Sequence, residues 1–147
     1  MKEETQRHLP EELLSLRLVG DNQWEFVYPR IGQQQWEQFY EVQDLWSSGI
    51  ESNISKSERG YRSLLKTYPE FIDAYHHLAI LLDETDRSQE AFEMWQRAVD
   101  IGLGCFPPNF SIGQDLLPWI LLNNRPFLRA YLPSARMMRT ILCVPHR

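Results

Sequence analysis

The sequence lacks the features of a membrane protein or a secreted protein. No apolar run approaches the roughly 20 residues that a membrane-spanning helix needs. The first residues, MKEETQRHLPEELLS, are polar and acidic and contain no secretory apolar stretch. Cysteine is scarce, and Cys105 and Cys143 are far apart and match no metal-ligand spacing. We therefore expect a cytoplasmic protein with reduced thiols and no membrane contact.

Excess basic charge is also missing. The formal net charge is -5 and the pI is near 5.4, whereas a general nucleic-acid binder presents a basic surface. The charge is uneven, however, because no acidic residue follows Asp115. The same segment carries five arginines, which are Arg125, Arg129, Arg136, Arg139 and Arg147. Two interpretations stay open: nucleic-acid contact through these arginines, and the favoured one, solvated helix faces that balance the acidic body.

Catalytic motifs are absent as well. The chain has no nucleophile elbow, no phosphate-binding glycine loop and no HExxH motif. The adjacent His76 and His77, with Asp73 one helical turn before His77, leave open a metal-binding protein or an enzyme that also uses Cys105. A metal site needs three or four converging ligands. We therefore expect a protein that is not an enzyme, with no catalytic residue, no metal and no cofactor.

What the sequence does contain is a core and an internal repeat. Its 147 residues are 43% hydrophobic and 12% aromatic, which excludes a wholly disordered chain and fits one domain or a short array of repeats. Sliding the chain by 34 residues aligns positions of like character. The aligned pairs are Ser57 with Ala91, Tyr61 with Trp95, and Leu64 with Ala98. Their spacings of three and four residues place them on one helix face.

A third amphipathic stretch lies between the two aligned segments. Its apolar residues recur at helical spacing and are Phe71, Tyr75, Leu78, Ala79 and Leu82. Pro69 ends the helix before it, and a polar turn over residues 83–86 ends the stretch itself. The centre of the chain is therefore predicted to be three consecutive helices joined by turns. A further helix is expected before them, within Gln35–Ser48.

This pattern resembles the tetratricopeptide repeat (TPR) family. One clear repeat covers about residues 72–103, with Tyr75, Leu78, Ala79, Leu82, Ala91, Trp95 and Ala98 at positions typical of the family. Part of a preceding repeat is visible in Ser57, Tyr61, Leu64 and Pro69. The resemblance implies an all-α fold of stacked helical hairpins, with about six helices. It also implies a cytoplasmic scaffold for protein–protein interaction that binds a peptide or protein partner through a concave groove.

The resemblance also implies which residues line the groove. They are Asp73, His76, Ile80, Asp83 and Glu84, with His77 toward the flank. A subclass of the family clamps a peptide's C-terminal carboxylate with Lys, Asn and Arg. The corresponding residues here are His76, Ile80 and Glu84, so that clamp is absent. An acidic groove favours a basic or neutral peptide.

The segments that flank the repeat are less regular. Residues 1–34 are expected to be irregular or partly extended. Within them a helix from Pro10 to Leu18 is slightly favoured over two strands joined by a turn at Gly20-Asp21-Asn22. Residues 35–132 form the expected TPR-like domain, with a short helix from Asp115 to Leu122 and another from Asn124. Residues 133–147 form a tail or cap, whose apolar residues suggest a homodimer through the C-terminal helices: Met137, Met138, Ile141, Leu142 and Val144.

Overall fold

The computed structural model describes residues 9–142, with the side chains of residues 9–136. Its strands are β1 (Ser15–Gly20) and β2 (Gln23–Val27). Its helices are α1 (Gln33–Ser47), α2 (Glu51–Thr67), α3 (Ile72–Glu84), α4 (Ser88–Leu103) and α5 (Arg125–Leu142), with a short 3-10 helix η1 (Leu122–Asn124) before α5. The part of the chain that is described thus holds five α-helices rather than about six.

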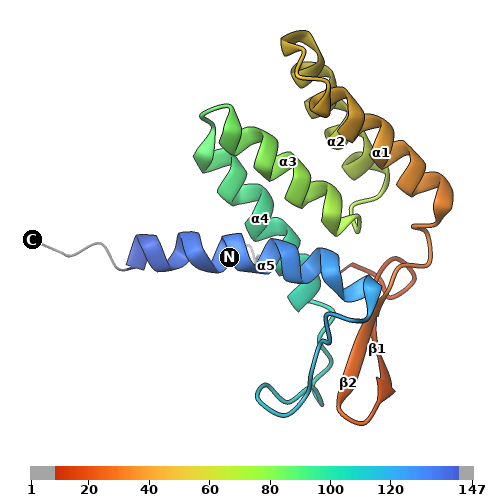
Figure 1. Ribbon diagram of the computed structural model, residues 1–147. Helices are drawn as coiled ribbons and strands as arrows, with labels where there is room; N and C mark the ends of the chain where they lie inside the picture. The colour runs from red at the N-terminus through yellow and green to blue at the C-terminus, as the bar shows by residue number, and fades with distance from the viewer. Residues whose placement is uncertain (1–8, 143–147) are drawn as a thin grey trace, which may run out of the picture.

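The helices are arranged as two hairpins and one further helix. Figure 1 shows α1 beside α2, α3 beside α4, and α5 crossing next to α3 and α4. The predicted helix within Gln35–Ser48 and the three predicted central helices are confirmed as α1 to α4. The start of α1 follows from a local signal, because the Gln35 side chain accepts a hydrogen bond from the Gly32 N–H at 2.9 Å and so satisfies a donor at the helix start.

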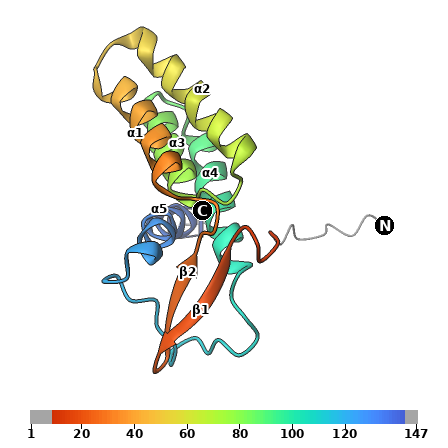
Figure 2. The same ribbon diagram turned by 90° about the vertical axis from the view of Figure 1, so that its right-hand side faces the viewer.

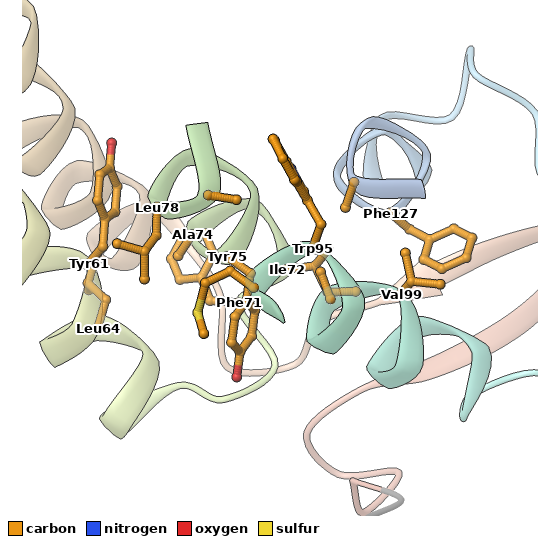
Figure 3. Packing of buried hydrophobic residues seen from close by; sticks show 14 of the residues in the cluster. Tyr61, Leu64, Phe71, Ile72, Ala74, Tyr75, Leu78, Trp95, Val99 and Phe127 are labelled. Carbon is orange, nitrogen blue, oxygen red and sulfur yellow. The ribbon is translucent and has the colours of Figure 1, made fainter. Parts of the chain in front are cut away.

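The core lies between α2, α3, α4 and α5. The six residues aligned at a period of 34 are all buried, three on α2 and three on α4. Ala91 and Ala98 have no exposed surface, so the backbones of α3 and α4 can approach closely. Figure 3 shows Trp95 projecting from α4 between α3 and α5, while the Phe127 ring of α5 lies near Val99 of α4. Gly102 permits this packing, because a Cβ atom there would collide with the Phe127 ring.

The all-α prediction is wrong, because the chain also contains a two-stranded antiparallel sheet. Strands β1 and β2 pair with Leu16 opposite Phe26, and Figure 2 shows this hairpin extending away from the helices. The favoured helix from Pro10 to Leu18 is reduced to one turn, in which the N–H groups of residues 13 and 14 bond to the Pro10 carbonyl. Residues 15–27 form strands rather than a helix because the strand conformation buries the Phe26 ring against Phe106 and Phe127. This packing outweighs the local preference for a helix start.

The predicted helix from Asp115 to Leu122 is also absent. The Leu116 N–H donates to the Asn22 carbonyl at 2.7 Å, and the Leu116 carbonyl accepts from the Trp24 N–H at 3.0 Å. This backbone is therefore committed to the strand hairpin and cannot form helical hydrogen bonds. Asp115 instead accepts a hydrogen bond from the Ser111 N–H within a turn.

Helix α5 passes through Pro133 without ending there. The boundary expected between residues 132 and 133 therefore falls inside a helix. No helix within residues 9–142 is both long enough and apolar enough to span a membrane. The side chains that suggested a homodimer, from Met137 to Val144, lie outside the described side chains.

Candidate functional site

The candidate site is a pocket where the N-terminal ends of α1, α3 and α5 converge. It has a volume of about 80 Å³. Its walls come from residues within 28–36, from residues 71–73 at the start of α3, and from residues 122–126 at the start of α5. In Figure 1 these three helix starts lie together near the base of the strand hairpin. Three elements that are distant in sequence therefore build one concave site.

Asp73 is the charged residue inside this pocket. It is only 3% exposed, and its Oδ2 accepts a hydrogen bond from Arg129 Nη1 at 3.0 Å. Its second oxygen, Oδ1, has no hydrogen-bond partner among the described residues, and the nearest cationic candidate, His77 Nδ1, is 3.7 Å away. A buried acceptor without a partner costs free energy. Asp73 is therefore held in the wall of the pocket mainly by its ion pair with Arg129.

Tyr28 also lines the pocket, and its hydroxyl oxygen is buried. Within the described part of the chain its hydroxyl has no hydrogen-bond partner either. Burial raises the pKa of Tyr28 well above its ordinary value, and the electrostatic effects of Asp73 and of the Cys105 thiol raise it further. The hydroxyl therefore keeps its proton and can both donate and accept. Tyr28 and Asp73 thus bring two polar side chains to a pocket wall that is otherwise largely apolar and aromatic, as ligand sites commonly do.

The structure places the predicted groove residues on one side of α3, although not all are accessible. Asp73 is buried in the pocket, whereas His76, His77 and Ile80 are half-buried and Asp83 and Glu84 are exposed. We call the stripe formed by these last five residues the α3 face. Figure 1 shows α3 with α5 on one side and the α1–α2 hairpin on the other. The α3 face therefore continues from the pocket to the far end of the helix.

The side chains of His76 and His77 contact different residues. His76 Nδ1 accepts a hydrogen bond from the Trp95 indole N–H at 3.0 Å. The His77 ring packs edge-on against Phe39 in α1 with centroids 4.9 Å apart. Burial lowers the pKa of His76 to about 4, and the nearby charges of His77 and Arg129 lower it further. His76 is therefore a neutral, structural acceptor at neutral pH.

This lowered pKa predicts a loss of stability in acid. Above about pH 6.5 the imidazole is neutral in both the folded and the unfolded chain. As the pH falls from about 6.5 toward about 4, the unfolded chain binds a proton before the folded chain does. We therefore expect the free energy of unfolding of the wild type to be lower at about pH 4.5 than at about pH 7.5. The variant His76→Gln should reduce this difference by roughly 1–2 kcal/mol, as measured by urea unfolding at the two pH values. An unchanged difference in the variant would contradict this assignment.

The contacts of Cys105 are with residues other than His76 and His77. It follows α4, and its thiol lies 3.5 Å from the Ile101 carbonyl and 3.8 Å from the Leu14 carbonyl. Burial raises the pKa of Cys105 to about 11, which disfavours the thiolate that a nucleophile or a metal ligand requires. Among residues 9–136, no three His, Cys, Asp or Glu side chains are placed to hold a metal ion. His76, His77 and Cys105 thus do not form a common site.

Arg125 and Arg129, in the first half of α5, make contacts with the segment before this helix and with α3. Arg125 donates to the Trp119 carbonyl at 2.8 Å. Both Arg125 and Arg129 lie over the Trp119 ring, at 5.1 and 5.8 Å from its centroid, and Arg129 also pairs with Asp73. Arg136 lies in α5, and the side chains of residues 139 and 147 are outside the described ones. These two arginines therefore make contacts within the folded chain, and Arg129 holds the Asp73 carboxylate that lines the pocket.

Sequence reasoning missed most of the pocket wall. Tyr28 and Trp36 were visible as aromatic residues, and Asn123 as part of a loop, but nothing in their spacing relates them to Asp73. Leu122, also in the wall, is 66% exposed, and Trp119, three residues before it and outside the lining, is 52% exposed. Exposed apolar side chains at the edge of a pocket are a recognisable mark of binding surfaces. The exposure of these side chains is known only from the folded structure and not from the sequence.

Comparison of the chain with models of protein families, with curated proteins and with solved structures finds no match. The pocket and the α3 face are therefore interpreted from their own geometry and chemistry.

Proposed function

We propose that this protein is a TPR-like interaction module that binds a peptide segment along the α3 face, with one side chain of the peptide inserted into the pocket. The observation that carries the proposal is the pocket of about 80 Å³ at the start of α3, which Asp73 lines and which continues into the α3 face. The stacked helical hairpins and the resemblance at a period of 34 support it. On this proposal the protein is a non-enzymatic scaffold.

Charge along the α3 face favours a particular polarity of partner. Arg129 neutralises Asp73 at the pocket end. Asp83 and Glu84 are exposed at the other end of α3, where the Asp83 carboxylate also accepts a hydrogen bond from Ser88 Oγ at 3.0 Å. We propose that basic residues of the peptide lie near Asp83 and Glu84, since complementary charge steers and orients partners. Cys105 is a free thiol, which supports a cytoplasmic setting.

A selection from a random peptide library tests the proposal. We expect enriched peptides to carry a basic residue at one end, and to lose affinity at least about tenfold when Asp83→Lys and Glu84→Lys are combined, because attraction becomes repulsion. The matched control is Glu93→Lys combined with Asp100→Lys, which makes the same charge change on exposed positions of α4. Enrichment of no peptide, or an equal loss of affinity in both double variants, would contradict the proposal.

A further inference from the structure

We propose that the outer edge of β1 binds an extended segment of a partner protein as a third, antiparallel strand. The segment carries an acidic residue opposite Arg17 and an apolar residue on each side of it. This site is separate from the pocket and from the α3 face. The inference rests on the hydrogen bonds of the strand hairpin, on an exposed side chain of β1 and on the charge of Arg17.

The hydrogen bonds of β2 show which backbone groups of β1 are unused. Leu16 lies opposite Phe26, and Leu18 lies opposite Trp24. The Phe26 N–H and the Trp24 carbonyl bond to the side chain of Asn124, so these two residues direct their backbone groups away from β1. Opposite residues of an antiparallel pair alternate between bonded and non-bonded pairs. The N–H and C=O groups of Leu16 and Leu18 therefore point away from β2.

These four outward-facing groups form a free strand edge, which we call the β1 edge. Within the part of the chain that the structure describes, none of them has a hydrogen-bond partner. In Figure 1, β1 is the right-hand strand of the hairpin and no further element lies beside it on that side. The other edge is covered, because Leu116 and Asn124 bond to β2 and its turn. A row of unpaired strand groups is a template for an added strand.

The side chains of β1 set the apolar part of the partner. Leu18 is 54% exposed. Side chains alternate between the two faces of a sheet, so partner residues opposite Leu16 and Leu18 lie on the face that carries these leucines. Apolar residues at both positions remove the exposed surface of Leu18 from water. The register shift that follows Leu18 ends regular pairing there, which limits the site to a short segment.

Arg17 sets the charge of the partner residue between those two. It is exposed and lies opposite Glu25 on β2. Among residues 9–136, however, the ion pairs that are formed do not include Arg17. Opposite charges directly across a pair of strands stabilise the pairing, and like charges destabilise it. An acidic residue is therefore favoured opposite Arg17, and a basic one is disfavoured.

Hydrogen exchange on the whole protein tests the β1 edge. The probe is the capped peptide acetyl-Thr-Thr-Val-Glu-Val-Thr-Thr-amide, for which we expect a Kd below about 1 mM. In the free protein the Arg17 amide, which pairs with β2, should exchange at least about tenfold more slowly than those of Leu16 and Leu18. Bound peptide should slow exchange at these leucines at least about tenfold. Slow exchange at both before peptide is added, or unchanged exchange with it, would overturn the inference.

Matched peptides test the pairing and the charge. Methyl groups on the backbone nitrogens of both valines remove the donors that would face the β1 edge, so binding should be lost. Replacing the glutamate by lysine should weaken binding at least about fivefold. This preference should disappear in Arg17→Gln. Binding of the methylated peptide, or equal binding of the glutamate and lysine peptides to the wild type, would overturn the inference.

Two protein variants complete the test. Leu18→Pro removes an N–H that points away from β2, and proline is tolerated on an edge strand at such a position. We expect the unfolding midpoint to stay close to that of Leu18→Thr, which keeps the N–H, while only the proline variant loses the peptide. Equal binding by both would overturn the inference. Asp83→Lys combined with Glu84→Lys should leave this binding unchanged, and its loss there would place the peptide on the α3 face instead.

Discussion

Trp95→Ala is expected to lower the free energy of unfolding by about 3–5 kcal/mol, as large-to-small changes of buried aromatic residues do. Trp95 is 6% exposed and projects from α4 toward α3 and α5 (Figure 3). Its removal leaves a cavity between these helices. The substitution also removes the indole N–H that bonds to His76 at 3.0 Å, so the half-buried imidazole loses its partner.

Urea unfolding followed by far-UV circular dichroism measures this loss without relying on tryptophan fluorescence. Trp119→Ala is the matched control, because Trp119 is 52% exposed and its main contacts are with Arg125 and Arg129. We expect that control to cost no more than about 1 kcal/mol. Equal unfolding curves for the two variants would show that Trp95 is not part of the core.

Asn124→Ala is expected to have an effect of similar size, about 3–5 kcal/mol. Asn124 has no exposed surface. Its Oδ1 accepts from the Phe26 N–H at 3.0 Å, and its Nδ2 donates to the Trp24 carbonyl at 2.8 Å and to the Pro118 carbonyl at 3.2 Å. Alanine would leave these three backbone groups without their partner, and each buried group so abandoned costs about 1–3 kcal/mol.

The neighbouring residue provides the control for this prediction. Asn123 is exposed, so Asn123→Ala should change stability by less than about 0.5 kcal/mol. Native-state hydrogen exchange would locate the effect. In Asn124→Ala the amides of β1 and β2 should lose protection before those of α2 to α4, because Asn124 attaches the strands to the helical body. Uniform loss of protection across the chain would contradict that role.

The sequence predicts the helical part of this fold well and the strands poorly. Residues that recur every three or four positions specify α1 to α4 through contacts within each helix or between adjacent helices. The choice between helix and hairpin at residues 10–28 depends on partners about 100 positions away. Asn124 and Leu116 bond to the backbone of β2 and its turn, and no pattern within residues 10–28 contains that information.

For the candidate site, too, the placement of residues along one helix could be predicted, whereas contacts between distant elements could not. Helical spacing places Asp73 on the same side of α3 as Ile80 and Glu84, as predicted. Its burial and its pairing with Arg129, which is 56 positions later, could not be predicted. Tyr28 and Trp36 could not be assigned to the site for the same reason, since they line one pocket with Asp73 only in the folded chain.

We expect the attachment of the strand hairpin by Asn124 to form late in folding. The helical hairpins close short loops, whereas the bonds from Phe26 and Trp24 to Asn124 span 98 and 100 residues. Contacts of such long separation form late, because closing a long loop costs entropy before the contact is gained. During synthesis, β2 leaves the ribosome well before Asn124 does, and until then its Leu116-facing edge is unpaired. We therefore expect nascent chains that stop before residue 116 to aggregate through this edge.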